Sequence, residues 1–253
     1  MSPLAIPAAP IVAPGAGAEI ADKYAARLVG QWLDALHVEA RRAGAALHAH
    51  FLTREGRIGG NAIAQRRWAA RVERIFGNRL LASRLESGSR AKFNLQLDVM
   101  LPMDGLGLTA VPGELAWLAG LRMSVISGGP NSHPSQELHF VAALSRHALT
   151  RMVQRCHCET AADLHAAFRA AWPGLSRAEE VTREQRKAEP SLVWRVPVIL
   201  PTMAEPAIFV VAGPGPDDDP RIFFVKTAFP ISFLGPRERA DALAAWTGPP
   251  SRI

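Results

Sequence analysis

The sequence predicts an α+β protein in which an N-terminal helical region precedes a small domain of helices packed on an antiparallel β-sheet. Apolar residues recur every three or four positions in the first ninety residues, as in amphipathic helices. From about residue 91 apolar and polar side chains alternate, and near the C-terminus three runs rich in Val, Ile and Phe are separated by Pro-Gly-Asp loops. With 253 residues, of which 48% are hydrophobic, the chain can bury a substantial core.

Residues 1–19 are rich in proline and alanine, and we expect a flexible leader there. The prolines interrupt every apolar stretch and the segment lacks a basic start, so it does not have the pattern of a secretory signal peptide. The chain also lacks an apolar run of about eighteen residues, so we expect no membrane span. These features predict a cytoplasmic protein, or one delivered into a target cell without an N-terminal signal peptide.

The helical region is expected at residues 20–90. An apolar stripe that includes Trp32 predicts a helix over about 20–48, and a second stripe predicts another over about 62–85. Both helices are rich in arginine: Arg41, Arg42, Arg66, Arg67, Arg71, Arg74 and Arg79. A solvated helical face would explain these arginines, and so would an RNA-binding arm.

An α+β domain is expected at residues 91–253. The alternating residues 93–99 predict a half-buried strand. A short apolar helix is expected at about 113–120, and a second strand at 121–126.

Two helices with recognisable starts are expected between Ser145 and Trp172. Ser145 is placed to cap the first, and Thr160 with Asp163 is placed to cap the second. Pro173 and the glycine after it are expected to end this pair.

A third helix is expected to begin at the capping box of Ser176 and Glu179 and to run to about residue 187. A final helix is expected to begin at Pro236. Between them, three extended runs predict an antiparallel meander: Leu192–Leu200, Ala207–Ala212 and Arg221–Ala228.

Charge and cysteine content limit the classes of function. The chain has 29 Lys and Arg against 23 Asp and Glu, a net charge of +6 and a pI near 10.1, which favours an anionic partner such as RNA. Cys156 and Cys158 are too close in sequence for a comfortable disulfide. Together with His157 and His165 they offer four possible ligands for zinc, but closely spaced ligands at a helix end project poorly toward one ion. We therefore expect no metal site and no cofactor.

The segment SRHALTRMVQR, residues 145–155, has the most chemical content. On a helix, His147, Arg151 and Arg155 fall within an arc of roughly 80°, opposite an apolar face. A histidine can transfer a proton near neutral pH, and an arginine fork matches two phosphate oxygens. This face suits phosphoryl chemistry, although an ordinary exposed helical face would also explain it.

This segment resembles the histidine-alanine-leucine-x-arginine-methionine helix of small bacterial domains with the barnase, EndoU, colicin and RelE-like ribonuclease-toxin fold. The run FFVKTAFPI, residues 223–231, is similar to the last strand of that group. The resemblance covers about residues 138–235, the candidate catalytic part, and has no counterpart in the helical region. It implies metal-independent RNA cleavage by a toxin or effector, through attack of the ribose 2′-OH on its own phosphate, with RNA as substrate and an antidote or immunity protein as a further partner.

The resemblance also assigns roles. His147 would act as acid or base, Arg151 would hold the phosphate, and Thr227 would donate from its hydroxyl. Arg155 or Lys226 would add positive charge, although successive strand residues face opposite ways and only one of Lys226 and Thr227 can face the site.

A second proton-transfer group is not identified by the pattern. Arg195 and His139 are the candidates for it, and Arg195 is also a candidate substrate-binding residue. The alternative function is that of a non-catalytic basic adaptor, which binds an acidic partner or a nucleic acid.

Overall fold

The computed structural model describes residues 16–52, 62–87, 93–103, 109–111, 114–127, 135–189, 193–212 and 224–247. The helices are α1 (Ala16–Leu52), α2 (Ala62–Phe76), η2 (Gly77–Arg79), α3 (Arg146–Arg155), α4 (Ala161–Ala188), η3 (Ile231–Phe233) and α5 (Pro236–Thr247). The strands are β1 (Leu80–Ser87), β2 (Phe93–Pro102), β3 (Thr109–Val111), β4 (Glu114–Ser127), β5 (Ser135–Ser145), β6 (Val193–Val198), β7 (Ala207–Ala212) and β8 (Phe224–Pro230).

One sheet runs through the molecule in the order β1-β2-β4-β5-β8-β7-β6, with β3 paired to β4. Neighbouring strands are antiparallel except β5 and β8, which are parallel and pair only at Ala143–Phe224 and Leu144–Val225. Beyond this short joint β5 ends, and α3 packs against β8. The chain is therefore an α+β protein, as the sequence predicts, with one parallel joint in an otherwise antiparallel sheet.

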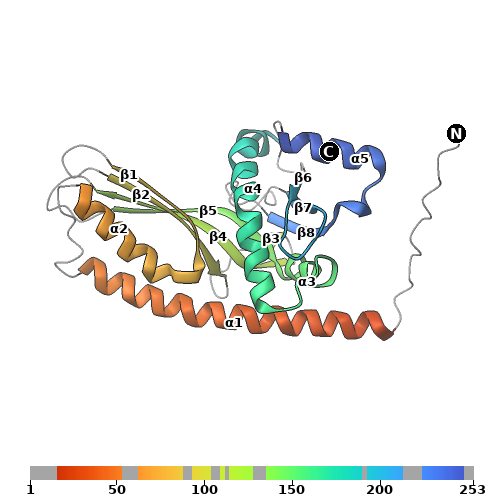
Figure 1. Ribbon diagram of the computed structural model, residues 1–253, viewed down its shortest axis with the longest axis horizontal. Coiled ribbons are helices and arrows are strands. Elements are labelled where there is room, and N and C mark those ends of the chain that lie inside the picture. Colours follow the sequence, from red (N-terminus) through yellow and green to blue (C-terminus); the bar gives the residue numbers. More distant parts are fainter. Residues whose placement is uncertain are drawn as a thin grey trace, which may run out of the picture.

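Most of the buried apolar side chains lie in three clusters on the two faces of the sheet. The central core lies where α1, α3 and α4 meet strands of both halves, and includes Trp32, Leu149, Trp172, Phe209, Val225 and Ala228. The α2 core lies under α2 and includes Trp68, Val72, Leu95, Leu97, Leu121 and Met123. The α5 core consists of Ile208, Ile231, Leu234 and Ala242, with Val210 and Phe229 packed against it. Figure 1 shows α1 running along the molecule below the sheet and α4 crossing the middle.

The helix predicted over 62–85 is wrong in its second half. α2 ends at Phe76, and Gly77 follows with a φ of 53°, a left-handed conformation that terminates helices and favours glycine. Leu80 then opens β1, which pairs along its length with β2. The apolar residues after Gly77 fit a helical period and a strand equally well, and sheet pairing decides between them.

The short helix predicted at 113–120 is also wrong. Residues 114–127 form one long strand, β4, because both of its edges are paired, one with β2 and the other with β5. The strand β5, at Ser135–Ser145, was not predicted from the sequence.

The helix pair predicted to end at Pro173 is instead continued by α4, which has Pro173 in its interior. A proline there removes a backbone hydrogen bond and costs about 3 kcal/mol. The buried face, however, continues across it at helical spacing through Leu164, Phe168, Trp172 and Leu175, and Pro173 lies on the exposed side. Tertiary packing thus overrides the local signal.

Several predicted features are confirmed. Ser145 caps α3, since its hydroxyl accepts a hydrogen bond from the Ala148 backbone N–H at 3.1 Å. Thr160 and Asp163 form a reciprocal capping box at the start of α4. The strands β6, β7 and β8 form the predicted antiparallel meander, and α5 begins at the predicted Pro236.

The expected division of the chain at residue 90 falls between β1 and β2, which are paired strands of one sheet. α1 begins at Ala16, inside the expected leader 1–19, and residues 1–15 lie outside the described part. Within the part of the chain that is described, no helix is long and apolar enough to cross a membrane.

Candidate functional site

Helix α3 holds the predicted catalytic face, and its two sides have different environments. Ala148, Leu149 and Met152 are fully buried in the central core. His147 is exposed and Arg151 half-buried on the other side. The helix begins directly after the last residue of β5, so the sheet sets its position.

The structure brings His147 and Arg151 together. The Arg151 Nε donates to the His147 Nε2 at 3.5 Å, and the Arg151 Nη1 donates to the Gln154 side chain at 2.7 Å. Gln154 in turn donates to Asp22 of α1. The lone pair of His147 Nε2 therefore accepts a hydrogen bond from a guanidinium that α1 and α3 hold in place.

Arg155 extends this basic surface toward the end of β8. Its guanidinium lies 5.7 Å from the ring centroid of Phe233, which stacks on Phe229 with a centroid distance of 6.2 Å. Phe233 is 63% exposed. Burial and the neighbouring charge of Arg151 lower the pKa of Arg155. The result is an exposed aromatic ring beside two clustered cations.

Thr227 occupies a different side of the sheet. Its register partner is Val210, which packs against the α5 core, whereas α3 packs in the central core through the opposite face. Among the residues that the structure describes, no hydrogen bond or ion pair joins Thr227 to His147 or Arg151. Within the described residues, the predicted catalytic residues joined by a hydrogen bond are thus His147 and Arg151 of α3.

Lys226 lies at an irregularity of β8. Val210 pairs with Thr227 and Val211 with Val225, so Lys226 is an extra residue opposite this step. The strict alternation used to weigh Lys226 against Thr227 does not hold at this point. Both side chains are half-buried.

The remaining candidates are separated from α3. Arg195, on β6, donates to Glu238 of α5 at 2.8 Å, so an acid already compensates its charge. His139, on β5, lies 3.8 Å from Glu137 and is half-exposed. Neither is bonded to a residue of the α3 face within the described ranges.

Cys156 and Cys158 are completely buried free thiols at the turn from α3 to α4. Burial raises the pKa of Cys156 to about 12 and that of Cys158 to about 11. His157, between them, has a φ of 54°. In the described ranges, no group of three or more His, Cys, Asp or Glu side chains is placed to hold a metal ion.

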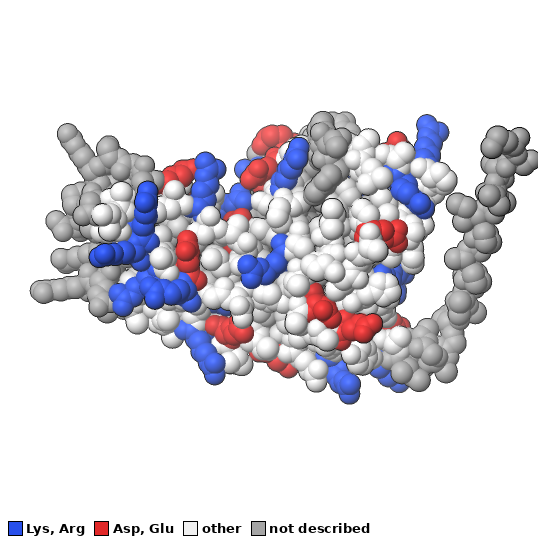
Figure 2. Space-filling model, in the orientation of Figure 1, with Lys and Arg blue, Asp and Glu red and all other residues white. Residues whose placement is uncertain are grey.

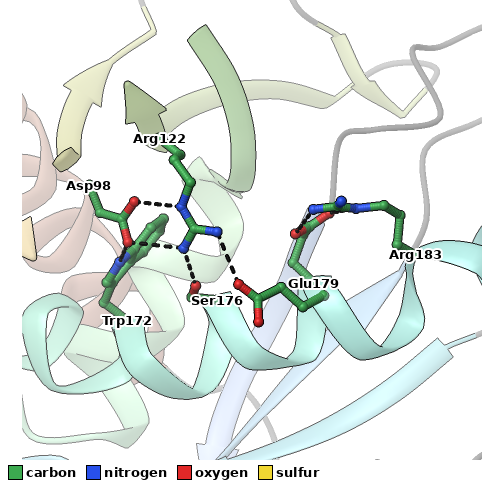
Figure 3. A network of polar contacts seen from close by, with 7 residues as sticks. Asp98, Arg122, Trp172, Ser176, Glu179 and Arg183 are labelled. Carbon is green, nitrogen blue, oxygen red and sulfur yellow. Dashed lines mark hydrogen bonds and ion pairs between the residues drawn. The ribbon is translucent and has the colours of Figure 1, made fainter. Parts of the chain in front are cut away.

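A second polar cluster, not predicted from the sequence, lies where α4 crosses β2 and β4 (Figure 3). Arg122 donates to both carboxylate oxygens of Asp98, from Nε at 2.8 Å and from Nη2 at 3.1 Å. The Trp172 indole donates to the same carboxylate at 2.9 Å. Hydrogen bonding to Asp98, the largest contribution, raises the pKa of Arg122. Asp98 is 6% exposed, so this is a largely buried ion pair with satisfied partners.

Helix α4 provides further partners for the same cluster. The Arg122 guanidinium also donates to Ser176 at 2.7 Å and to Glu180 at 3.0 Å. One turn on, Arg183 binds both carboxylate oxygens of Glu179, at 2.9 and 2.7 Å. Ser176 and Glu179 were predicted to start a helix, and this is wrong: they lie inside α4 and bind arginines.

Two cavities border these elements. One of about 400 Å³ lies between α4 and the strands β2, β4 and β5, beside the Arg122 cluster. Another of about 630 Å³ lies between α1 and α4, with Trp32, Glu39, His165 and Arg169 on its walls. Neither of these two cavities includes a residue of α3.

The sequence did contain a signal for the second cluster. Asp98 and Arg122 are charged residues inside largely apolar strands, and such residues need partners when buried. The pairing of Asp98 with Arg122 depends on the register of β2 and β4, which the sequence does not reveal.

Comparison with known proteins adds no relative. The chain matches no family model, and it has no significant match among curated proteins or among solved structures.

Proposed function

We propose that the exposed face of α3 binds RNA and cleaves it by metal-independent attack of the ribose 2′-OH. The observation that carries this proposal is the contact between His147 and Arg151. A proton acceptor and a phosphate-binding guanidinium lie side by side, on a helix held in place by the sheet. In-line attack on a phosphodiester needs these two groups close together.

The proposed step transfers two protons, one to His147 and one to the leaving oxygen, and exchanges one bond at phosphorus. Arg151 turns from His147 to the phosphate, which frees the Nε2 lone pair, and this nitrogen takes the proton of the 2′-OH as its oxygen attacks the adjacent phosphorus. The bond from phosphorus to the 5′-oxygen breaks, and the leaving oxygen takes a proton from water, whose hydroxide then takes the proton back from His147. The products are a 2′,3′-cyclic phosphate and a 5′-hydroxyl. Arg151 holds the phosphate and stabilises the charge that builds on its oxygens.

Substrate binding is supported by the surface next to this pair. Arg155 adds positive charge, and Phe233 exposes a flat ring on which an RNA base can stack. Lys226 is a further cation of this region, at the irregularity of β8 beside α3. Thr227 is not part of the proposal, because its register places it toward the α5 core.

The resemblance of residues 145–155 and 223–231 to bacterial ribonuclease toxins favours the same reaction. On this proposal the protein acts on RNA in the cytoplasm, either of its own cell or of a cell that it enters. An antidote or immunity protein would then cover α3.

The test is incubation of the purified protein with total RNA in the presence of EDTA. We expect cleavage that leaves cyclic phosphate ends, and a fall in rate of about 100-fold or more for His147→Ala, because a positioned proton acceptor contributes at least that factor. Arg151→Ala should slow the reaction with the same end chemistry. RNA that stays intact at high protein concentration, or cleavage by His147→Ala at the wild-type rate, would refute the proposal.

Matched controls separate the site from general effects of charge. His48→Ala and Arg177→Ala remove an exposed histidine of α1 and an exposed arginine of α4. Both variants should cleave like the wild type. If Arg177→Ala slows cleavage as much as Arg151→Ala does, Arg151 contributes only bulk charge.

A second candidate function, that of a basic adaptor, is favoured by α2. Arg66, Arg67, Arg71 and Arg74 are exposed on the side of α2 opposite its buried residues. Figure 2 shows basic side chains gathered over this helix, at the left of the view. Intact RNA whose binding is lost on charge reversal at Arg67 and Arg74 would select this function over cleavage.

A further inference from the structure

The cavity of about 400 Å³ between α4 and the sheet has no part in the proposed cleavage site. Its walls are Gln96, Arg122, Ser124, His139, Phe140, Val141, Glu179 and Arg183. Strand pairing places Gln96 beside Ser124 and Arg122 beside His139, so three neighbouring strands present polar side chains to one space. Its volume lies in the range of small-ligand sites.

Two of these side chains have hydrogen-bonding groups that no described residue uses. Ser124 is only 8% exposed, and within the described ranges its hydroxyl has no hydrogen-bond partner. The Gln96 amide likewise forms no hydrogen bond to a described residue. Both groups lie in the cavity wall, where a ligand could form hydrogen bonds to them.

The charges around the cavity argue against an anionic ligand. Asp98 and Glu180 compensate Arg122, and Glu179 binds Arg183 through two hydrogen bonds. Each guanidinium thus already faces a carboxylate, and a phosphate here would lie next to these acids. The preferred ligand is uncharged, with both donors and acceptors.

The groups that stay available match a flat ligand with a hydrogen-bonding edge. The Gln96 amide combines one acceptor with two donors, the arrangement that reads the edge of a base in nucleic-acid complexes. Ser124 adds a hydroxyl, and the half-exposed ring of His139 offers a surface for stacking.

We propose that this cavity binds a nucleobase. The proposal rests on the proposed function in one respect, that an RNA strand on α3 would supply the base. His139 lies on the strand that leads into α3, and its separation from Ser145 is about 20 Å at about 3.3 Å per residue, so the two sites can hold different nucleotides of one strand. A free nucleoside has the same recognition chemistry.

The test is titration of the full chain with adenosine, guanosine, cytidine and uridine, followed by NMR shifts and calorimetry. We expect saturable binding of at least one nucleoside. Gln96→Leu and Ser124→Ala should each weaken it by at least about tenfold, since an unmatched hydrogen-bonding group on the base would remain. Gln31→Leu, at an exposed position of α1, should bind like the wild type.

Two further measurements distinguish an RNA base from a free nucleoside, and the cavity proposal from the cleavage proposal. Short single-stranded RNA that binds more tightly than any nucleoside, and loses affinity in Gln96→Leu, identifies an RNA base, whereas equal affinity identifies a free nucleoside. The variant His147→Ala should retain nucleoside binding, so the cavity can be correct even if the wild type cleaves no RNA. No saturation by any nucleoside, unchanged affinity in folded Gln96→Leu and Ser124→Ala, or binding of neutral sugars alone would overturn the proposal.

Discussion

Two thiols at the turn between α3 and α4 illustrate how burial sets the chemistry of single residues. Cys156 and Cys158 are fully buried. Burial disfavours the thiolate, and the pKa values rise to about 12 and about 11, well above the ordinary value of about 8.5. The Thr202 hydroxyl, beside Cys158, partly offsets this effect. Both thiols therefore stay protonated at neutral pH and are poor nucleophiles.

The raised pKa values of Cys156 and Cys158 predict a loss of stability at alkaline pH. A thiol whose pKa is raised in the folded state keeps its proton while the unfolded chain loses it, so its contribution is complete below about pH 8.5 and is lost as the pH rises toward about 12. Urea unfolding of the wild type between pH 7 and 11 should show a steeper decline than a Cys156→Ala, Cys158→Ala variant. If the free energy of unfolding declined equally steeply with pH in the two proteins, the raised pKa values of the two thiols would be contradicted.

The docking of α4 on β4 depends on a close approach that only glycine allows. A Cβ added to Gly120 would lie 1.8 Å from the six-membered ring of Trp172. The same tryptophan donates to Asp98, so its ring cannot shift without breaking a buried hydrogen bond. The Arg122 cluster and this contact together fix α4 over the sheet, and with it the walls of the polar cavity.

Gly120→Ala should accordingly be strongly destabilising. We expect the free energy of unfolding to fall by about 1–3 kcal/mol or more, measured by urea denaturation, because the added methyl group overpacks a rigid core. Gly30→Ala is the matched control. Its Cβ would meet nothing within 4 Å, and alanine should stabilise α1 by up to about 1 kcal/mol. If the two variants had similar free energies of unfolding, the Trp172 ring would be able to move aside for the added methyl group at little cost.

Over the whole molecule, a single sheet and a shared core join the N-terminal helices to the rest of the chain. α1 contributes Trp32 and its apolar neighbours to the central core, where they meet α3 and α4. β1 pairs along its length with β2, across the expected boundary at residue 90. Loss of α1, α2 or β1 would therefore expose apolar surface of the part after residue 90.

Unfolding should therefore be one cooperative transition. Trp68 lies in the α2 core and Trp172 in the central core, so Trp68→Phe and Trp172→Phe leave the fluorescence weighted toward different parts. Their fluorescence midpoints in urea should coincide with those from far-UV circular dichroism of the same variant. Separate midpoints would show that the α2 core and the central core unfold independently.

Local sequence patterns predicted those elements whose local structural preference agrees with their contacts in the folded protein. The caps at Ser145 and Thr160, the strand at residues 93–99, the final meander and the start of α5 at Pro236 are examples. The periodicity of residues 145–155 likewise placed His147 and Arg151 on one helical face, and the structure shows them in contact.

The tertiary structure decided what depends on distant partners. Leu80 and the residues after it became a strand because β2 was available to pair with them, and α4 continued through Pro173 because its buried face did. The Arg122 cluster, the polar cavity and the separation of Thr227 from α3 all follow from strand register. By itself the sequence determined composition, helix caps and the spacing along each element, which are local properties. Register and the packing of elements depend on contacts between residues far apart in the chain, and their free energy appears only once the sheet is assembled.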